Sequence, residues 1–203
     1  MTRTARALSA AAGLTAIGGQ TRAHSFGAGL DHYEQIVAGT GAVLDHPGIL
    51  LLLAALGILL GLWRTDGMVR AWPAFLAGQA IGVPVATVVG LWAQNGLLVL
   101  GIIVAGLAAL LPRHGRPEAL GLAFLTGLAP VAISLEGLGL FEVSLLIHLG
   151  LLLGVNLVSA LAATAVSMTT ARLDAVWVRS LWRILCSWIA AILVLNLAVE
   201  VSA

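Results

Sequence analysis

The chain has 203 residues, of which 60% are hydrophobic and 9% are charged, and its formal net charge at pH 7 is +1. A soluble domain carries about 25% charged residues, so this composition, with a mean hydropathy of +1.06, excludes a soluble globular protein and predicts an integral membrane protein. The net charge gives no indication of nucleic-acid binding. The single cysteine, Cys186, excludes an internal disulfide and a cysteine-rich metal site.

The N-terminal stretch has the order of a secretory signal peptide. Arg3 and Arg6 precede a short apolar run, and the small residue Ala23 precedes His24. This pattern predicts a signal peptide over residues 1–23. The alternative is an N-terminal helix that the mature protein retains.

Residues 24–46 are expected to form an outer, pre-membrane segment. Tyr33, Ile36 and Val37 share one face in a helical projection, which predicts a short helix lying at the membrane interface. Residues 47–203 are then expected to form the transmembrane domain.

Six continuous apolar stretches follow, and none shows the alternation of a membrane β-barrel. We therefore predict an all-α protein, a compact bundle of six transmembrane helices. The predicted spans are residues 47–63, 71–93, 95–112, 118–136, 141–168 and 178–200. Pairs of glycines four residues apart predict close helix contacts; they are Gly57/Gly61, Gly78/Gly82 and Gly150/Gly154. Gln79, Asn156 and Asn196, inside the spans, are expected to form hydrogen bonds between helices.

Arginines occur only in alternate loops of this arrangement. The loops that contain them hold Arg64 and Arg70, then Arg113 and Arg116, then Arg172, Arg179 and Arg183. The positive-inside rule places these loops in the cytoplasm. We therefore expect a multi-pass protein of a bacterial inner (plasma) membrane, with both ends of the mature chain on the periplasmic or extracellular side.

Acidic and imidazole side chains gather on the predicted outer side. Asp31-His32 and Asp45-His46 form two Asp-His pairs ahead of and at the start of the first span. Carboxylates without basic partners attract divalent cations and raise their local concentration. Asp45-His46, at the helix entrance, is the better candidate for the ion site. Asp31-His32 is either a collecting pair or simply a solvated loop.

Three further residues on that side are candidate metal ligands. Glu136 and Glu142 bracket a short outer loop, and His148 is placed about two turns into the fifth span. A titratable side chain at such depth indicates a functional site. Imidazole and carboxylate together suit nickel, cobalt or zinc, whereas copper(I) prefers sulfur ligands.

Taken together, these features resemble the HupE/UreJ family of hydrogenase- and urease-associated membrane proteins. That family has a signal peptide, six spans and an Asp-His pair in a pattern of the form HPxxGxDH. Here GLDH at 29–32 matches the end of the pattern, VLDH at 43–46 lies where the family's first span begins, and residues 183–192 are similar to its last span. Gly41 and Gly27 stand where the family has a His four residues before each Asp. The resemblance implies a nickel or cobalt permease.

We therefore expect a non-enzymatic permease for a divalent metal, nickel first and cobalt or zinc as alternatives, with the metal as cargo and no resident cofactor. Its partners would be the lipid bilayer and the ion, with no nucleic acid, and it could form a homo-oligomer or join other membrane subunits. One alternative is a non-catalytic membrane subunit of a larger complex. Another is a haem-binding redox subunit, for which His148 and His46 would have to supply the axial ligands.

Overall fold

The computed structural model describes residues 30–90, 92–111, 115–138, 142–173 and 176–202. This part of the chain forms seven α-helices and no β-strand, which confirms the all-α class. The helices are α2 (His32–Leu44), α3 (Pro47–Trp63), α4 (Gly67–Val85), α5 (Trp92–Leu110), α6 (Arg116–Ser134), α7 (Leu145–Arg172) and α8 (Val176–Ser202). The predicted signal peptide lies outside the described residues.

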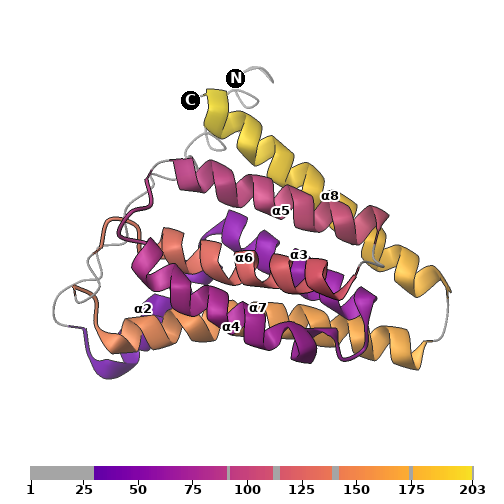
Figure 1. Ribbon diagram of the computed structural model, residues 1–203, viewed down its shortest axis with the longest axis horizontal. Coiled ribbons are helices and arrows are strands. Elements are labelled where there is room, and N and C mark those ends of the chain that lie inside the picture. The colour runs from indigo at the N-terminus through magenta and orange to yellow at the C-terminus, as the bar shows by residue number, and fades with distance from the viewer. Residues whose placement is uncertain (1–29, 91, 112–114, 139–141, 174–175, 203) are drawn as a thin grey trace, which may run out of the picture.

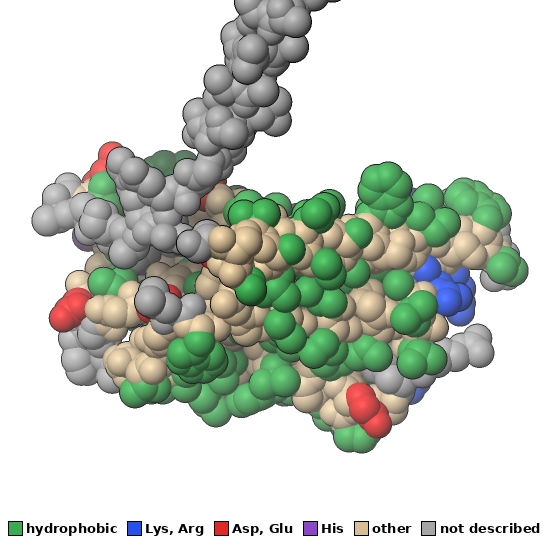
Figure 2. Space-filling model, turned by 90° about the horizontal axis from the view of Figure 1, so that it is seen from above, with side chains coloured by type: hydrophobic (Ala, Val, Ile, Leu, Met, Phe, Trp, Pro, Cys, Tyr) green, Lys and Arg blue, Asp and Glu red, His purple; other side chains and the backbone are tan. Residues whose placement is uncertain are grey.

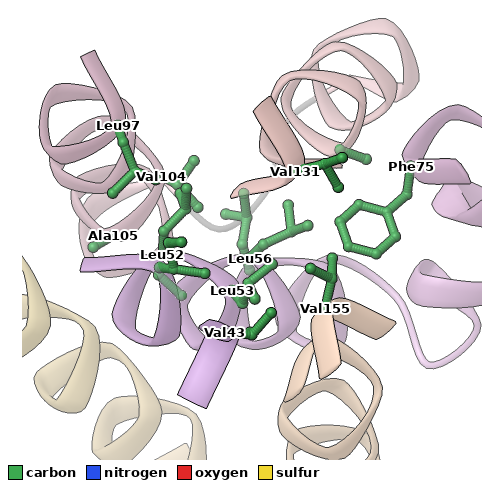
Figure 3. Packing of buried hydrophobic residues seen from close by; sticks show 14 of the residues in the cluster. Val43, Leu52, Leu53, Leu56, Phe75, Leu97, Val104, Ala105, Val131 and Val155 are labelled. Atoms are coloured by element: carbon green, nitrogen blue, oxygen red, sulfur yellow. The ribbon is translucent and has the colours of Figure 1, made fainter. Parts of the chain in front are cut away.

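Helix α3 lies at the centre of the bundle. Almost every side chain from Leu52 to Leu60 is fully buried. Figure 3 shows Leu52, Leu53 and Leu56 packed among side chains from α2, α4, α5, α6 and α7. A helix that is apolar on all sides belongs in the interior of a bundle, which is where this one lies.

Successive helices from α3 to α8 run in alternating directions (Figure 1). One end of the bundle therefore holds the C-terminal ends of α3, α5 and α7 and the N-terminal ends of α4, α6 and α8. All six described arginines belong to these segments: Arg64, Arg70, Arg116, Arg172, Arg179 and Arg183. We call it the arginine end and the opposite one the acidic end. Figure 2 shows arginines at one end of the visible face and most of the acidic side chains at the other.

Four helices, α5 to α8, are long and apolar enough to cross a membrane, and this identifies a membrane protein. Helices α2 and α3 pass the same test only as a pair, and the two are bent by 78° at the break between them. Helices occur at all six predicted span positions, but α4 is not among those that pass this test, so the predicted count of six spans stays a prediction. Helix α4 also ends at Val85 rather than at residue 93. Thr87 explains the early end, because its hydroxyl and its N–H both donate to the carbonyl of Pro84 and form a turn.

The glycine pairs lie where helices touch, as predicted. Gly57 and Gly61 face α7, Gly78 and Gly82 face α6, and Gly150 and Gly154 face α2. At each of these positions a Cβ atom would collide with, or press tightly against, the neighbouring helix. These contacts bring the helix backbones together and hold the bundle closed.

Helix α2, the helix expected in the pre-membrane segment, packs along α7. A Cβ on Gly39 would collide with the carbonyl oxygen of Ile147, and one on Gly150 with that of Ile36. Thr40 donates its hydroxyl to Gly150 O at 3.0 Å. Contacts advance together along both helices, so α2 and α7 run in the same direction from the acidic end.

Candidate cation site at the acidic end

The first Asp-His pair begins α2, and its carboxylate caps the helix. Asp31 Oδ1 accepts the N–H of Glu34 at 2.7 Å, and Glu34 Oε2 accepts the N–H of Asp31 at 3.0 Å. This reciprocal arrangement is a capping box, which satisfies backbone donors that the first helical turn leaves without partners. His32 is the first residue of the helix and is exposed. Helix capping by itself explains why carboxylates stand at Asp31 and Glu34, and no bound metal is needed for it.

The second pair forms the break between α2 and α3. The Asp45 N–H donates to Gly41 O at 2.8 Å and ends α2. His46 starts α3, because its Nδ1 accepts the N–H of Ile49 at 3.3 Å. Asp45 is exposed and His46 is half-buried. A neutral His46 with Nδ1 as acceptor carries its proton on Nε2.

This break lies within the bundle. Val43, two residues before Asp45, packs against Gly154 of α7. Gly154 lies nine residues after the start of α7, or about 14 Å along its axis at 1.5 Å per residue. On the other side, Gly48 lies against Leu97 and Leu98 of α5. The Asp45-His46 pair is therefore held between helices rather than at the tip of the acidic end.

The end of α2 adds negative charge to this place. Carbonyl groups at the C-terminal end of a helix are not all paired and carry a partial negative charge. Asp45 adds a carboxylate there, and Pro47, at the first position of α3, has no N–H to oppose it. Broken membrane helices use such C-terminal ends to coordinate cations.

His148 lies in the first turn of α7, which corrects the predicted depth of two turns. The helix begins at Leu145 because Ser144 caps it, accepting the N–H of Ile147 on Oγ at 3.3 Å. Nδ1 of His148 lies 3.0 Å from Ser144 O. A carbonyl oxygen only accepts, so Nδ1 carries the proton and Nε2 keeps its lone pair. Metal-binding histidines are usually oriented in this way.

A polar bridge joins α2 to the start of α7 beside His148. The hydroxyl of Ser144 donates to Gln35 Oε1 at 2.5 Å, and Gln35 Nε2 donates to Leu30 O at 2.8 Å. Sequence reasoning missed both residues. Ser144 stands three residues before Ile147 at the start of an apolar run, which is a recognisable capping signal. Nothing local marks Gln35, because its partner is 109 residues away.

The two glutamates flank the connection from α6 to α7. Glu136 follows α6 in a turn closed by its N–H to Ile133 O at 3.1 Å, and it is half-buried. Glu142 precedes α7 and is exposed. Within the described ranges, no three His, Cys, Asp or Glu side chains come together as a metal site. The seven predicted ligands thus occupy three places: the start of α2, the α2–α3 break, and the region from Glu136 to His148.

The predicted hydrogen bonding inside the spans is confirmed for Gln79 and Asn156. Asn156 Nδ2 donates to Gln79 Oε1 at 3.0 Å, and Trp72 Nε1 donates to Asn156 Oδ1 at 2.9 Å. Gln79 is 1% exposed, and its Nε2 has no hydrogen-bond partner. This network ties α4 to α7.

Comparison of the chain with protein-family models, with curated proteins and with solved structures finds no match in any of the three.

Proposed function

We propose that this protein is a permease for a divalent transition-metal ion, with nickel as the first candidate and cobalt and zinc as the others. The observation that carries the proposal is the break between α2 and α3, which holds Asp45 and His46 between the helices of an apolar bundle. Unwound segments inside membrane bundles are the usual ion sites of secondary transporters.

Asp45 supports a water-filled approach to the break. An ionised carboxylate is costly in hydrocarbon, and such groups face water-filled cavities or other protein groups. Asp45 is exposed although the helix it ends packs about 14 Å along α7. In the proposed arrangement, water reaches Asp45 from the acidic end and the ion follows the same path.

The imidazole ligand of the proposal is His148, and His46 has a different role. The Nε2 lone pair of His148 is available because Nδ1 donates to Ser144 O. His46 uses Nδ1 to start α3, and so it positions Asp45. His148 lies six residues, or about 9 Å, nearer the acidic end than Gly154. Asp45 and His148 would bind the ion weakly and one after the other. Weak binding lets an ion leave a site as well as enter it.

In the proposed orientation the acidic end faces the periplasm or the cell exterior, and the arginine end faces the cytoplasm. Both ends of the mature chain then lie outside, in the inner membrane of a bacterium. The membrane potential favours inward movement by about 2.3 kcal/mol per charge per 100 mV, or about twice that for a divalent ion. Asp31, His32, Glu136 and Glu142 would raise the cation concentration at the entrance.

Metal uptake by cells that express the chain tests the proposal. We expect uptake of nickel, cobalt or zinc above that of cells with an empty vector. Asp45→Asn and His148→Gln should each reduce metal uptake at least about tenfold. Each variant lacks a carboxylate or imidazole that would replace the hydration water of the ion as it enters the bundle. Glu200→Gln, which neutralises an acid in the last turn of α8, is the matched control and should leave uptake unchanged.

Equal amounts of each variant in the membrane must be shown by immunoblot. Uptake by both variants at the parental level would contradict the assignment of these ligands. No uptake by the parent chain itself would contradict the permease, and a membrane subunit of a larger complex would then be the better hypothesis.

A further inference from the structure

A groove runs along the side of the bundle, from the middle of α7 toward the arginine end. It lies between the first half of α4 and residues 156–167 of α7, with Gly61 of α3 as its floor, and encloses about 220 Å³. Met68 and Trp72 form one wall and Ala160 and Ser167 belong to the other. Trp72 is 47% exposed, so the groove opens at the side of the bundle.

The length of the groove matches one leaflet of a bilayer. From Ser167, near the arginine end, to Asn156 is 11 residues of α7, or about 16 Å. Half of the hydrocarbon core is about 15 Å. The deep end is closed where Trp72 Nε1 donates to Asn156 Oδ1 at 2.9 Å, and this bond also holds the indole ring as a flat wall.

Polarity changes along the groove as it does along a phospholipid. The deep and central parts are lined mainly by apolar and small side chains, whereas the hydroxyls of Thr65, Thr164 and Ser167 lie toward the arginine end. Next to Thr65, Arg64 and Arg70 share the single carboxylate of Asp66. Two cations with one anion leave a net positive charge at this mouth, which complements an anionic head group.

We propose that the groove between α4 and α7 binds an anionic phospholipid, with one acyl chain against Trp72 and Ala160 and the phosphate beside Arg64 and Arg70. This proposal does not depend on metal transport, because none of the proposed ion ligands lines the groove. The bound lipid covers the lateral opening and keeps α4 and α7 packed through Asn156.

Native mass spectrometry of the full chain in detergent tests the site, with phosphatidylglycerol and phosphatidylcholine of identical acyl chains as the probes. We expect one phosphatidylglycerol molecule to be retained in preference to phosphatidylcholine. Arg64→Gln and Arg70→Gln should each lower that preference about fivefold. Ala160→Trp should fill the groove and abolish retention, whereas Ala191→Trp, at an exposed alanine of α8, should not.

Circular dichroism and size-exclusion chromatography show whether each variant is folded, and Ala160→Leu replaces Ala160→Trp if the larger side chain prevents folding. Equal retention of both lipids by the parent overturns the proposal. Parental retention by the folded groove-filling variant also overturns it. A parental dimer that this variant separates, with lipid binding unchanged, shows that a second copy of the chain occupies the groove instead.

Discussion

The two ends of the bundle use their charged side chains in different ways. At the arginine end, three arginines contact acceptor groups of the protein itself. Asp66 lies between Arg64 and Arg70, and Arg183 donates from α8 to the carbonyls of Ala109 and Leu110 at the end of α5. Arginines at the C-terminal ends of helices offset the partial negative charge there.

At the acidic end, polar side chains serve helix starts instead. Asp31, His46 and Ser144 each accept a backbone N–H in the first turn of the helix that follows. None of the arginines in the described ranges lies at this end to neutralise a carboxylate. Those three arginines at the opposite end thus contact a carboxylate or helix carbonyls, whereas polar side chains at the acidic end contact backbone N–H groups at helix starts.

The largest expected effect comes from separating α2 from α7. Gly39→Val should lower the free energy of unfolding by about 3 kcal/mol or more, because the new side chain would collide with the backbone of Ile147. Hydrogen exchange should show lost protection in α2 and retained protection in α8. This result would show that the structure of the acidic end depends on the packing of α2 against α7, whereas that of the arginine end does not.

The matched control is Gly121→Val in α6, where an added Cβ meets no atom within 4 Å. Thermal denaturation of the purified protein in detergent compares the two variants. Equal stability of the Gly39 variant and the parent would show that the α2–α7 contact is not needed for the fold.

A second, smaller effect separates capping from metal binding at the break. His46→Ala should lower the free energy of unfolding by about 1 kcal/mol, because α3 loses its N-cap. His46→Asn should restore stability, since asparagine is a good N-cap, and should keep metal uptake close to that of the parent. Loss of uptake in a fully stable Asn variant would make His46 a ligand and would remove the reason for preferring His148.

At the arginine end, Arg183→Gln should lower the free energy of unfolding by about 0.3–1 kcal/mol, because the α5 carbonyls lose a charged donor. Arg179→Gln, one turn earlier on α8, is the control. The measurement is again thermal denaturation in detergent. An unchanged midpoint for the Arg183 variant would remove helix capping as the reason for an arginine at this position.

The smallest effect concerns Asp66. The hydrogen bond from Arg70 is the main reason why the pKa of Asp66 lies below its ordinary value of 3.8, with Arg64 adding to it. A carboxyl whose pKa is lowered in the folded state contributes stability above its ordinary pKa, and this contribution is lost as the pH falls through the lowered value. Asp66→Asn should therefore be slightly less stable than the parent at neutral pH.

At a pH well below 3.8 the difference between Asp66→Asn and the parent should vanish, because the carboxyl is then protonated in both the folded and unfolded states. Thermal midpoints of both proteins across this range provide the measurement. A difference that persists in strong acid would show that the two arginines do not stabilise the fold through the charge of Asp66.

Properties that depend on composition or on nearby residues were predicted from the sequence. The α-helical class follows from long apolar runs, and each glycine pair lies on one helix face because four residues make about one turn. The positions of the arginines predicted which helix ends lie together, because charged side chains are costly inside the hydrocarbon core. Boundaries depended on finer local chemistry, and so Thr87 and Ser144 shifted the end of α4 and the start of α7.

The sequence by itself thus determined a membrane-embedded helical bundle, the helix faces that pack closely, and the grouping of acidic and basic residues at opposite ends. Only the tertiary structure decided which groups those residues contact. It placed Asp45-His46 inside the bundle through contacts of α2 with α7, oriented His148 on Ser144, and built the groove between α4 and α7. The physical reason is that apolar patterning reports which side chains avoid water, whereas the partner of each side chain depends on contacts between residues far apart in the chain.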